Sequence, residues 1–195
     1  SGNSGNFGGG AGIYYGGVLN NCKLVNNTSG YDGGGIWIGN GVMNNCTLSA
    51  NRCIIGDGAG TCRGTANNCI VYFNIGADRY LGTYNFSCTM SDASGTGNIT
   101  NDPQFVDAAA SNFHLQATSP CINRGNNAYA TNSATDLDGN PRIAWAVVDM
   151  GAYEHPSPVG YRIWADCVTN GLTNIDECAT GDGYPNLLKY ATGSS

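Results

Sequence analysis

The sequence has few charged residues. Only 11% of its residues are charged, and 8 lysines and arginines against 14 acidic residues give a net charge of −6. No basic cluster interrupts this acidic balance, which argues against nucleic acid as a partner. No apolar run approaches the roughly 18 residues that a membrane-spanning helix needs. We therefore expect neither a nucleic-acid partner nor a transmembrane segment.

The motifs of several enzyme and metal-binding classes are also missing. The chain has no Gly-x-Ser-x-Gly elbow and no Cys-x-x-Cys pair, and it has only 2 histidines. This scarcity argues against a structural zinc site. Its glycine-rich runs lack the lysine and the βα context of a phosphate-binding loop. We expect the chain to bind no cofactor, and calcium is the one candidate ligand.

The chain instead contains one sequence motif in three copies. Residues 18–27 recur at 42–51 and, with drift, at 65–74, and each copy carries Asn-Asn-Cys. A period of this size, with short β-prone runs between glycine-rich turns, predicts a solenoid in which each repeat forms one coil. The 30 glycines and the many asparagines suit such a fold, since both residue types tolerate the tight turns that it needs.

Strand alternation assigns the repeated residues to the inside or the outside of the coils. The cysteines of the three copies point inward and form an apolar ladder along the stack: Cys22, Cys46 and Cys69. The residues that follow them, Lys23, Thr47 and Ile70, point outward. The asparagines that close the copies form a second ladder at a turn: Asn27, Asn51 and Asn74. Their amides are expected to bond to neighbouring coils, so that no buried polar group lacks a partner.

Two short motifs connect these repeats to a family. Gly-Gly-Ile at 34–36 and the Leu-x-x-Asn segments at 24–27 and 48–51 resemble the repeats of polymorphic outer-membrane adhesins. Those adhesins are right-handed parallel β-helices. The resemblance therefore implies a right-handed parallel β-helix for residues 1–90.

A second resemblance covers about residues 64–155. Five motifs, at 101–107, 113–115, 119–125, 135–142 and 148–154, follow one another as in the C-terminal segment of secreted bacterial β-helix proteins of the choice-of-anchor Q type. The resemblance implies that these motifs form the last coils and the cap of the helix. It also implies a secreted or cell-surface location, and it implies no activity.

Three parts of the chain follow from these patterns. Residues 1–90 are expected to form β-helix coils, and residues 91–155 the C-terminal coils and the cap. Residues 156–195 are expected to form a linker and a small, partly helical appendage. The fold class is all-β. Because the chain begins inside a glycine-rich repeat, we also expect it to be part of a longer protein.

The 9 cysteines divide into two groups. If the three ladder cysteines stay free, six remain, and these form three candidate disulfides: Cys53 with Cys62, Cys88 with Cys121, and Cys167 with Cys178. Such bridges imply an oxidising compartment outside the cytoplasm. The alternative is a bridge between two ladder cysteines, because the spacing of stacked strands lies within the Cα range of a disulfide.

Several carboxylates have two alternative interpretations, either as a catalytic or calcium-binding site or as structural residues. Asp136, Asp138, Asp149 and Glu154 are close in sequence, as in a glycosidase acid and base pair or a calcium site. Asp182 is a further calcium candidate. The alternative is that Asp136 and Asp138 build a turn, and that Arg142 pairs with Asp149 or Glu154. We favour the second interpretation, and we expect His114 to be packed rather than catalytic.

The sequence thus predicts a non-catalytic structural or adhesive module, secreted or at the cell surface. Its partner would be a cell-surface glycan or protein, or its own copies stacked end to end as a filament. The rival hypothesis is the non-catalytic C-terminal part of a polysaccharide lyase or glycoside hydrolase, because parallel β-helices often carry such enzymes.

Overall fold

The computed structural model describes residues 2–5, 10, 16–91, 94–144 and 147–156. The chain divides into two units, Ser1–His155 and Pro156–Ser195. The expected appendage, with Cys167, Cys178 and Asp182, lies outside the described residues. In the described part of the chain the regular structure is almost entirely β, with one short 3-10 helix, η1 (Asn127–Tyr129). The all-β class is therefore confirmed.

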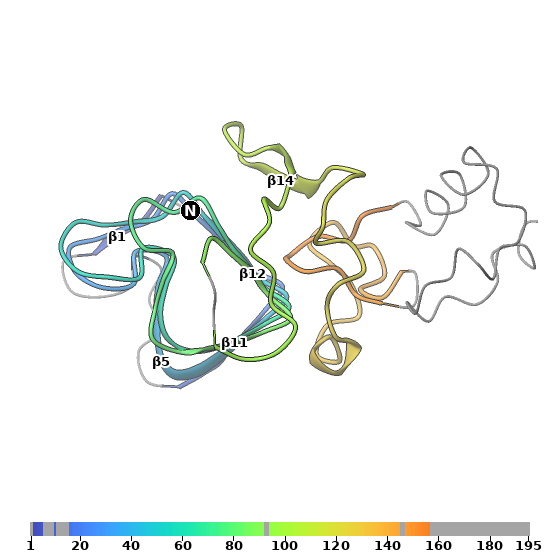
Figure 1. Ribbon diagram of the computed structural model, residues 1–195, viewed down its shortest axis with the longest axis horizontal. Helices are drawn as coiled ribbons and strands as arrows, with labels where there is room; N and C mark the ends of the chain where they lie inside the picture. The colour runs from blue at the N-terminus through green and yellow to red at the C-terminus, as the bar shows by residue number, and fades with distance from the viewer. Residues whose placement is uncertain (1, 6–9, 11–15, 92–93, 145–146, 157–195) are drawn as a thin grey trace, which may run out of the picture. The chain divides into compact units, whose positions relative to one another are not determined.

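Three parallel sheets make up most of the first unit (Figure 1). The first sheet runs β1 (Ser4–Gly5), β4 (Thr28–Ser29), β7 (Arg52–Cys53). The second runs β2 (Val18–Asn20), β5 (Ile36–Asn44), β8 (Thr61–Asn67), and both β10 (Arg79–Tyr80) and β11 (Thr83–Asn85) pair with β8. The third runs β3 (Lys23–Val25), β6 (Thr47–Ser49), β9 (Ile70–Val71), β12 (Cys88–Thr89). Because the strands of all three sheets pair in parallel, the chain must cross back to the same end of a sheet before it forms the next strand of that sheet.

The strand register reproduces the sequence repeat. Val18 pairs with Val42, and Val42 pairs with Thr65. In the third sheet Leu24 pairs with Leu48, which pairs with Val71. We call each run of chain that gives one strand to both the second and the third sheet a layer. Residues at the same position of the repeat therefore lie on top of one another in successive layers.

A fourth layer follows the three that the repeat predicts. β11 pairs with β8 and β12 pairs with β9, so residues 83–89 lie against residues 65–71. Contacts between these two layers join residues 18 apart in sequence, whereas the earlier layers are 24 and 23 apart. The separation is shorter because the chain between the first sheet and the second is shorter here: Ile75, which bridges to Arg52, is followed by β10 at Arg79, whereas β7 ends at Cys53 and β8 begins at Thr61.

The core lies between the second and third sheets. Its fully buried members come from the inward positions of the strands: Ile36, Ile38, Met43, Cys46, Leu48, Ala66, Cys69, Val71 and Tyr84. Leu19, Cys22 and Leu24 of the first layer pack against them and are only partly buried. Each fully buried aliphatic side chain of this kind stabilises the fold by about 1.5–3 kcal/mol.

Glycines let the layers approach closely where the chain turns from the first sheet into the second. A Cβ atom on Gly34 would lie 2.4 Å from the carbonyl oxygen of Ala59, and one on Gly60 would lie 2.5 Å from that of Asp78. Both obstacles are backbone atoms and cannot move aside cheaply. The Gly-Gly runs of the repeat are therefore required by the contact between neighbouring layers.

Residues 94–101 cover the exposed side of the fourth layer. The amide nitrogens of Tyr84 and Phe86 donate to the carbonyl oxygens of Ser94 and Thr96, at 2.9 and 2.7 Å. Cys88 forms a parallel bridge with Ile99. This segment therefore takes up part of the unpaired strand edge at that end of the stack.

The rest of the C-terminal segment lies beside the third sheet (Figure 1). It begins with an antiparallel hairpin of β13 (Phe105–Asp107) and β14 (Asn112–Leu115). From there to His155 it packs against the outer side of the third sheet, beside the layers rather than over their end (Figure 1). The outward residues Thr47 and Ile70 are consequently buried, 1% exposed each. The outward face of the third sheet carries enough apolar surface to bind the C-terminal segment. Strand alternation alone does not reveal this contact.

Candidate functional site

The structure brings Asn27, Asn51 and Asn74 together as one buried ladder. The backbone nitrogen and Nδ2 of Asn27 donate to Oδ1 of Asn51, at 3.0 and 2.9 Å. Asn51 repeats both bonds to Oδ1 of Asn74 at the same distances. Each amide oxygen thus accepts from both the backbone and the side-chain nitrogen of the asparagine in the preceding layer, so these buried polar groups stabilise the stacking of the layers.

Different residues occupy the two ends of this asparagine ladder. Asn3, in the described segment before the first layer, donates to Oδ1 of Asn27. At the other end Asn74 donates from both nitrogens to Oδ1 of Asp78, at 3.0 and 2.8 Å. The second oxygen of Asp78 accepts from the backbone nitrogen of Met90 at 3.3 Å. A carboxylate suits this end because it only accepts, here from Asn74 on one side and from Met90, which follows β12 of the fourth layer, on the other.

A second asparagine ladder was not predicted. In it Nδ2 of Asn44 donates to Asn20, that of Asn67 donates to Asn44, and that of Asn85 donates to Asn67, at 2.8–3.0 Å. These are the first asparagines of the Asn-Asn-Cys phrase and of its fourth copy. Asn20, Asn44 and Asn67 recur at the repeat spacing, and that recurrence was the available signal.

The cysteine ladder runs beside it, as the alternation pattern predicts. The backbone nitrogen of Cys22 lies 3.4 Å from Sγ of Cys46, and Cys46 and Cys69 are both fully buried. The ladder continues in a residue that the sequence interpretation missed: Cys69 donates its backbone N–H to Oγ of Ser87 at 3.0 Å. Burial, together with the Cys69 thiol, raises the pKa of Cys46 well above its usual value against the opposing effect of Cys22, so it stays protonated.

Seven cysteines lie in the described residues, and all are free thiols. The bridges that we expected between Cys53 and Cys62 and between Cys88 and Cys121 are not formed. Cys53 Sγ lies 3.4 Å from the carbonyl oxygen of Gly56. For Cys88, by contrast, the interaction with the thiol of Cys121, followed by burial, raises the pKa, and its Sγ donates to the carbonyl oxygen of Asn101 at 3.2 Å. The interaction between the two thiols is therefore the leading cause of a pKa shift only at Cys88 of these two expected pairs.

One column of outward residues holds the C-terminal segment on the third sheet. Lys23 lies 5.8 Å from the ring centre of Phe113 and 5.7 Å from that of Tyr153. Thr47 Oγ1 accepts from the backbone nitrogen of Ala152 at 3.0 Å. Ile70 and Cys88 continue the column in the next two layers. The asparagines before the column take part as well: Asn68 accepts from the backbone nitrogen of Asn126 at 2.7 Å.

Asp136 builds a turn, as our preferred interpretation expects. Its Oδ1 accepts from the backbone nitrogens of Asp138 and Asn140, at 2.9 Å each, and its Oδ2 accepts from that of Glu154 at 2.9 Å. Asp138 is instead directed at His114, with Oδ2 2.5 Å from Nε2. In the described ranges no three His, Cys, Asp or Glu side chains are grouped to hold a metal ion.

Arg142, Asp149 and Glu154 form a buried cluster of charged residues within the C-terminal segment. Arg142, 1% exposed, donates from Nη2 to Glu154 Oε1 at 2.8 Å and to the carbonyl oxygens of Asp149 and Gly151 at 3.1 and 2.8 Å. Its Nη1 reaches Oδ1 of Asn21 in the first layer at 3.3 Å. Arg142 thus pairs with Glu154, and it also fixes the segment to the stack.

Two carboxylates share this one guanidinium. Burial raises the pKa of Asp149 to about 6, against the bonds that it accepts from the backbone nitrogens of Asn123 and His155. Burial and then the charge of Asp149 raise the pKa of Glu154 to about 8. Because Arg142 carries one charge, a proton on one of the two acids relieves the excess negative charge.

His114 is held on both sides of its ring. Nδ1 lies 2.6 Å from Oδ1 of Asn112, Nε2 contacts Asp138, and the ring packs on Tyr153 with centres 4.2 Å apart. The side chain is 42% exposed, so it is packed on one face only. This is a positioned histidine, and its position agrees with the packed role that we expect.

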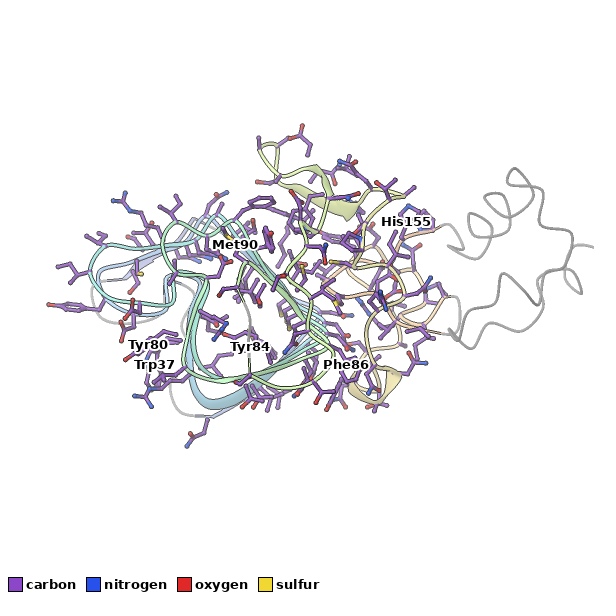
Figure 2. All side chains as sticks on the ribbon, viewed as in Figure 1. Trp37, Tyr80, Tyr84, Phe86, Met90 and His155 are labelled. Atoms are coloured by element: carbon purple, nitrogen blue, oxygen red, sulfur yellow. The ribbon has the colours of Figure 1, made fainter. Side chains whose placement is uncertain are left out.

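A column of large side chains lies on the outer face of the second sheet. Trp37 and Tyr80 both pair with Cys62, one from each neighbouring strand. Figure 2 shows the two rings on the outer side of β5. Burial, followed by the charge of Asp32, raises the pKa of Cys62 to about 11. The sequence interpretation missed this surface, because the aromatic residues are 43 positions apart and only the register unites them.

No family model, curated protein or solved structure matches this chain. In the portion of the chain that the structure describes, no helix is long and apolar enough to cross a membrane.

Proposed function

We propose that the layers form a right-handed parallel β-helix, and that this module is a secreted or cell-surface structural or adhesive element without catalytic activity. The register supports the helix, because three parallel sheets share layers at sequence separations of 24, 23 and 18 residues. The resemblance of residues 24–51 to adhesin repeats and of residues 64–155 to a choice-of-anchor Q segment supports the proposed handedness and location.

The observation that carries the structural role is the pair of asparagine ladders. Both pass through successive layers, and each buried amide bonds to the next layer. A deformation of the stack would break several such bonds at once, and each broken buried bond costs about 1–3 kcal/mol. A stiff surface of this kind suits a module that displays a binding face.

The positions of the acidic residues support a non-catalytic role for the described residues, which the adhesive module and the non-catalytic part of a carbohydrate-active enzyme share. Asp136 accepts several backbone N–H groups, Asp149 accepts two, and Glu154 pairs with Arg142. All three are buried. A glycosidase needs two carboxyl groups that face a sugar across a defined gap, and these groups face the protein instead.

Self-assembly is the less favoured version of the proposal. Residues 94–101 occupy part of the strand edge at the fourth layer, and Asp78 ends one asparagine ladder there. A copy stacked on this end would have to displace that segment. We therefore favour a partner that binds the side of the module.

The test compares binding with turnover on the same carbohydrates. The protein is incubated with soluble neutral and acidic polysaccharides and with cell-wall preparations, and both retention of protein and release of reducing ends or unsaturated uronate are measured. We expect retention without product. Product formation that the Glu154→Gln and Asp149→Asn variants lose would contradict the proposal, and sedimentation of long polymers would favour the filament.

A further inference from the structure

We propose that the outer face of the second sheet, around Trp37 and Tyr80, binds a chain of neutral sugars. This inference rests on the proposed function, because it names the binding face and the partner class of an adhesive module. We call the surface formed by Trp37, Cys62, Tyr80, Asp32 and Asp57 the aromatic face.

The register fixes the two rings on one side of the sheet. Ile36 and Ile38 are buried at 0% and 1% exposure, so Trp37 between them points away from the core. Cys62 is its partner in β8, and Tyr80 is the partner of Cys62 in β10. Cys62 also points outward and yet is fully buried, as expected for a small side chain between two large ones. The rings therefore flank Cys62, and Tyr80 keeps 38% of its surface exposed.

Two carboxylates belong to the same face. Asp57 directly precedes Gly58, where a Cβ atom would lie 3.0 Å from the backbone nitrogen of Tyr80. Besides burial, the charges of Asp32 and Asp57 also raise the pKa of the Cys62 thiol. The backbone nitrogen of Asp57 donates to Oδ1 of Asp32 at 2.9 Å, which fixes the two residues relative to each other. Asp57 is exposed, and the other oxygen of Asp32 is not used by this bond. The face thus offers hydrogen-bond acceptors beside two aromatic rings.

This combination matches the chemistry of a sugar chain. A pyranose ring has an apolar C–H face that packs on an aromatic ring, and its hydroxyl groups donate to carboxylate oxygens. Trp37 and Tyr80 come from strands on either side of β8, so they are about 10 Å apart, which is two strand spacings. That distance is close to the length of a disaccharide unit. An extended oligosaccharide that crosses the strands can therefore place alternate rings on the two aromatics.

The negative charges of the aromatic face favour neutral sugars over acidic ones. Asp32 and Asp57 would repel the carboxylates of a uronate chain, and the chain as a whole carries a net charge of −6. Like charges brought together in this way cost free energy and disfavour the wrong partner. A neutral glycan is the occupant that uses both the rings and the acceptors without repulsion.

The test is isothermal titration calorimetry with three hexasaccharides, of β-1,4-linked glucose, β-1,4-linked mannose and α-1,4-linked galacturonate. We expect at least one neutral hexasaccharide to bind, and the galacturonate to bind roughly tenfold more weakly or not at all. Trp37→Ala and Tyr80→Ala should each weaken the neutral sugar roughly tenfold, and Asp57→Asn should weaken it severalfold. Leu137→Ala, at a side chain 43% exposed on the C-terminal segment, is the matched control and should bind as wild type.

Far-UV circular dichroism shows whether each variant is folded. If Trp37→Ala does not fold, Tyr80→Ala and Asp57→Asn carry the test, since both residues are exposed. Absence of neutral-sugar binding, unchanged affinity in folded Tyr80→Ala and Asp57→Asn, or stronger binding of galacturonate would each overturn the inference. Unaltered retention of Tyr80→Ala on cell-wall preparations would overturn the aromatic face alone and leave the adhesive function standing. Loss of all retention by the wild type would instead overturn the proposed function.

Discussion

Asn74 donates from its side chain to the carboxylate of Asp78 at 2.8 Å, and this bond ends a ladder that begins at Asn3. Asn27, Asn51 and Asn74 both donate and accept along the ladder, whereas Asp78 only accepts. The exchange of an amide for a carboxylate at the last position removes a donor that would otherwise face the N–H of Met90.

Asp78→Asn should therefore destabilise the protein. Its Nδ2 would face the backbone N–H of Met90, and two buried donors without an acceptor cost about 1–3 kcal/mol. Urea unfolding measures the difference. Asp102→Asn is the control, because Asp102 is exposed and accepts one local bond from Gln104 through an oxygen that asparagine retains. Equal stabilities of the two variants would contradict the role of Asp78.

Asn51→Ala should cost more, about 2–4 kcal/mol. Its side chain accepts two bonds from Asn27 and donates to Asn74 and to the carbonyl oxygen of Leu24, and all of these are lost together. Asn40→Ala, at an exposed position of β5, should change the free energy of unfolding by less than about 0.5 kcal/mol. Hydrogen exchange should show faster opening of the second and third layers in Asn51→Ala, and unchanged exchange there would count against the ladder.

The buried acids should make stability depend on pH. The pKa of Glu154 rises from 4.5 to about 8 on folding, and that of Asp149 rises from 3.8 to about 6. The folded state therefore binds more protons than the unfolded state between about pH 4 and 8, and these two groups stabilise less as the pH rises through that window. Their contribution should fall by on the order of 5 kcal/mol from pH 5 to pH 8.

Glu154→Gln isolates this contribution, because glutamine cannot ionise. The difference in unfolding free energy between wild type and variant should change over pH 5–8 in favour of the variant at the alkaline end. A difference that stays constant across the window would show that Glu154 keeps its ordinary pKa in the folded protein.

Arg142→Met should detach the C-terminal segment from the third sheet. Removal of the guanidinium leaves Glu154 and Asp149 buried without a counter-charge and leaves two carbonyl oxygens without a donor, at a cost of about 3–5 kcal/mol. Arg124→Met is the control at an exposed arginine and should be nearly neutral. Hydrogen exchange of residues 113–144 and 147–155 should rise selectively in the Arg142 variant, whereas a uniform rise over all layers would contradict a local role.

Cys88 and Cys121 should form a disulfide under oxidising conditions. Reaction with glutathione disulfide would join the two sulfur atoms, and the glutathione would leave as two thiols with the two protons. Peptide mapping by mass spectrometry should detect this bridge and leave Cys53 and Cys62 free, and the bridge should stabilise the protein by about 3 kcal/mol. A bridge between Cys53 and Cys62 in its place would contradict the contacts that the structure shows.

The stacking of the layers can be predicted from the sequence, whereas the segments that pack on the outside of the stack cannot. Cys22, Cys46 and Cys69 repeat at fixed spacing with one face apolar, so their stacking follows from alternation. Residues 83–89 escaped notice because their separation from the previous copy is shorter and Ser87 replaces the cysteine. Period alone could not reveal a copy with a different length.

The position of the C-terminal segment depends on long-range contacts. Arg142 and Asn21 are 121 residues apart, and no local pattern indicates that they meet. Trp37 and Tyr80 likewise share a face only because the layers stack in register. Single-sequence patterns report which side of a strand a residue takes, and they do not report which distant segment will cover that side.

The two asparagine ladders run in opposite directions. In the first, each Asn donates toward the later layers, from Asn27 to Asn51 to Asn74. In the second, each Asn donates toward the earlier layers, from Asn67 to Asn44 to Asn20. The amide dipoles of the two columns therefore oppose each other, unlike the aligned peptide dipoles of an α-helix. The stack can lengthen by further layers without accumulating a partial charge at either end from these side chains.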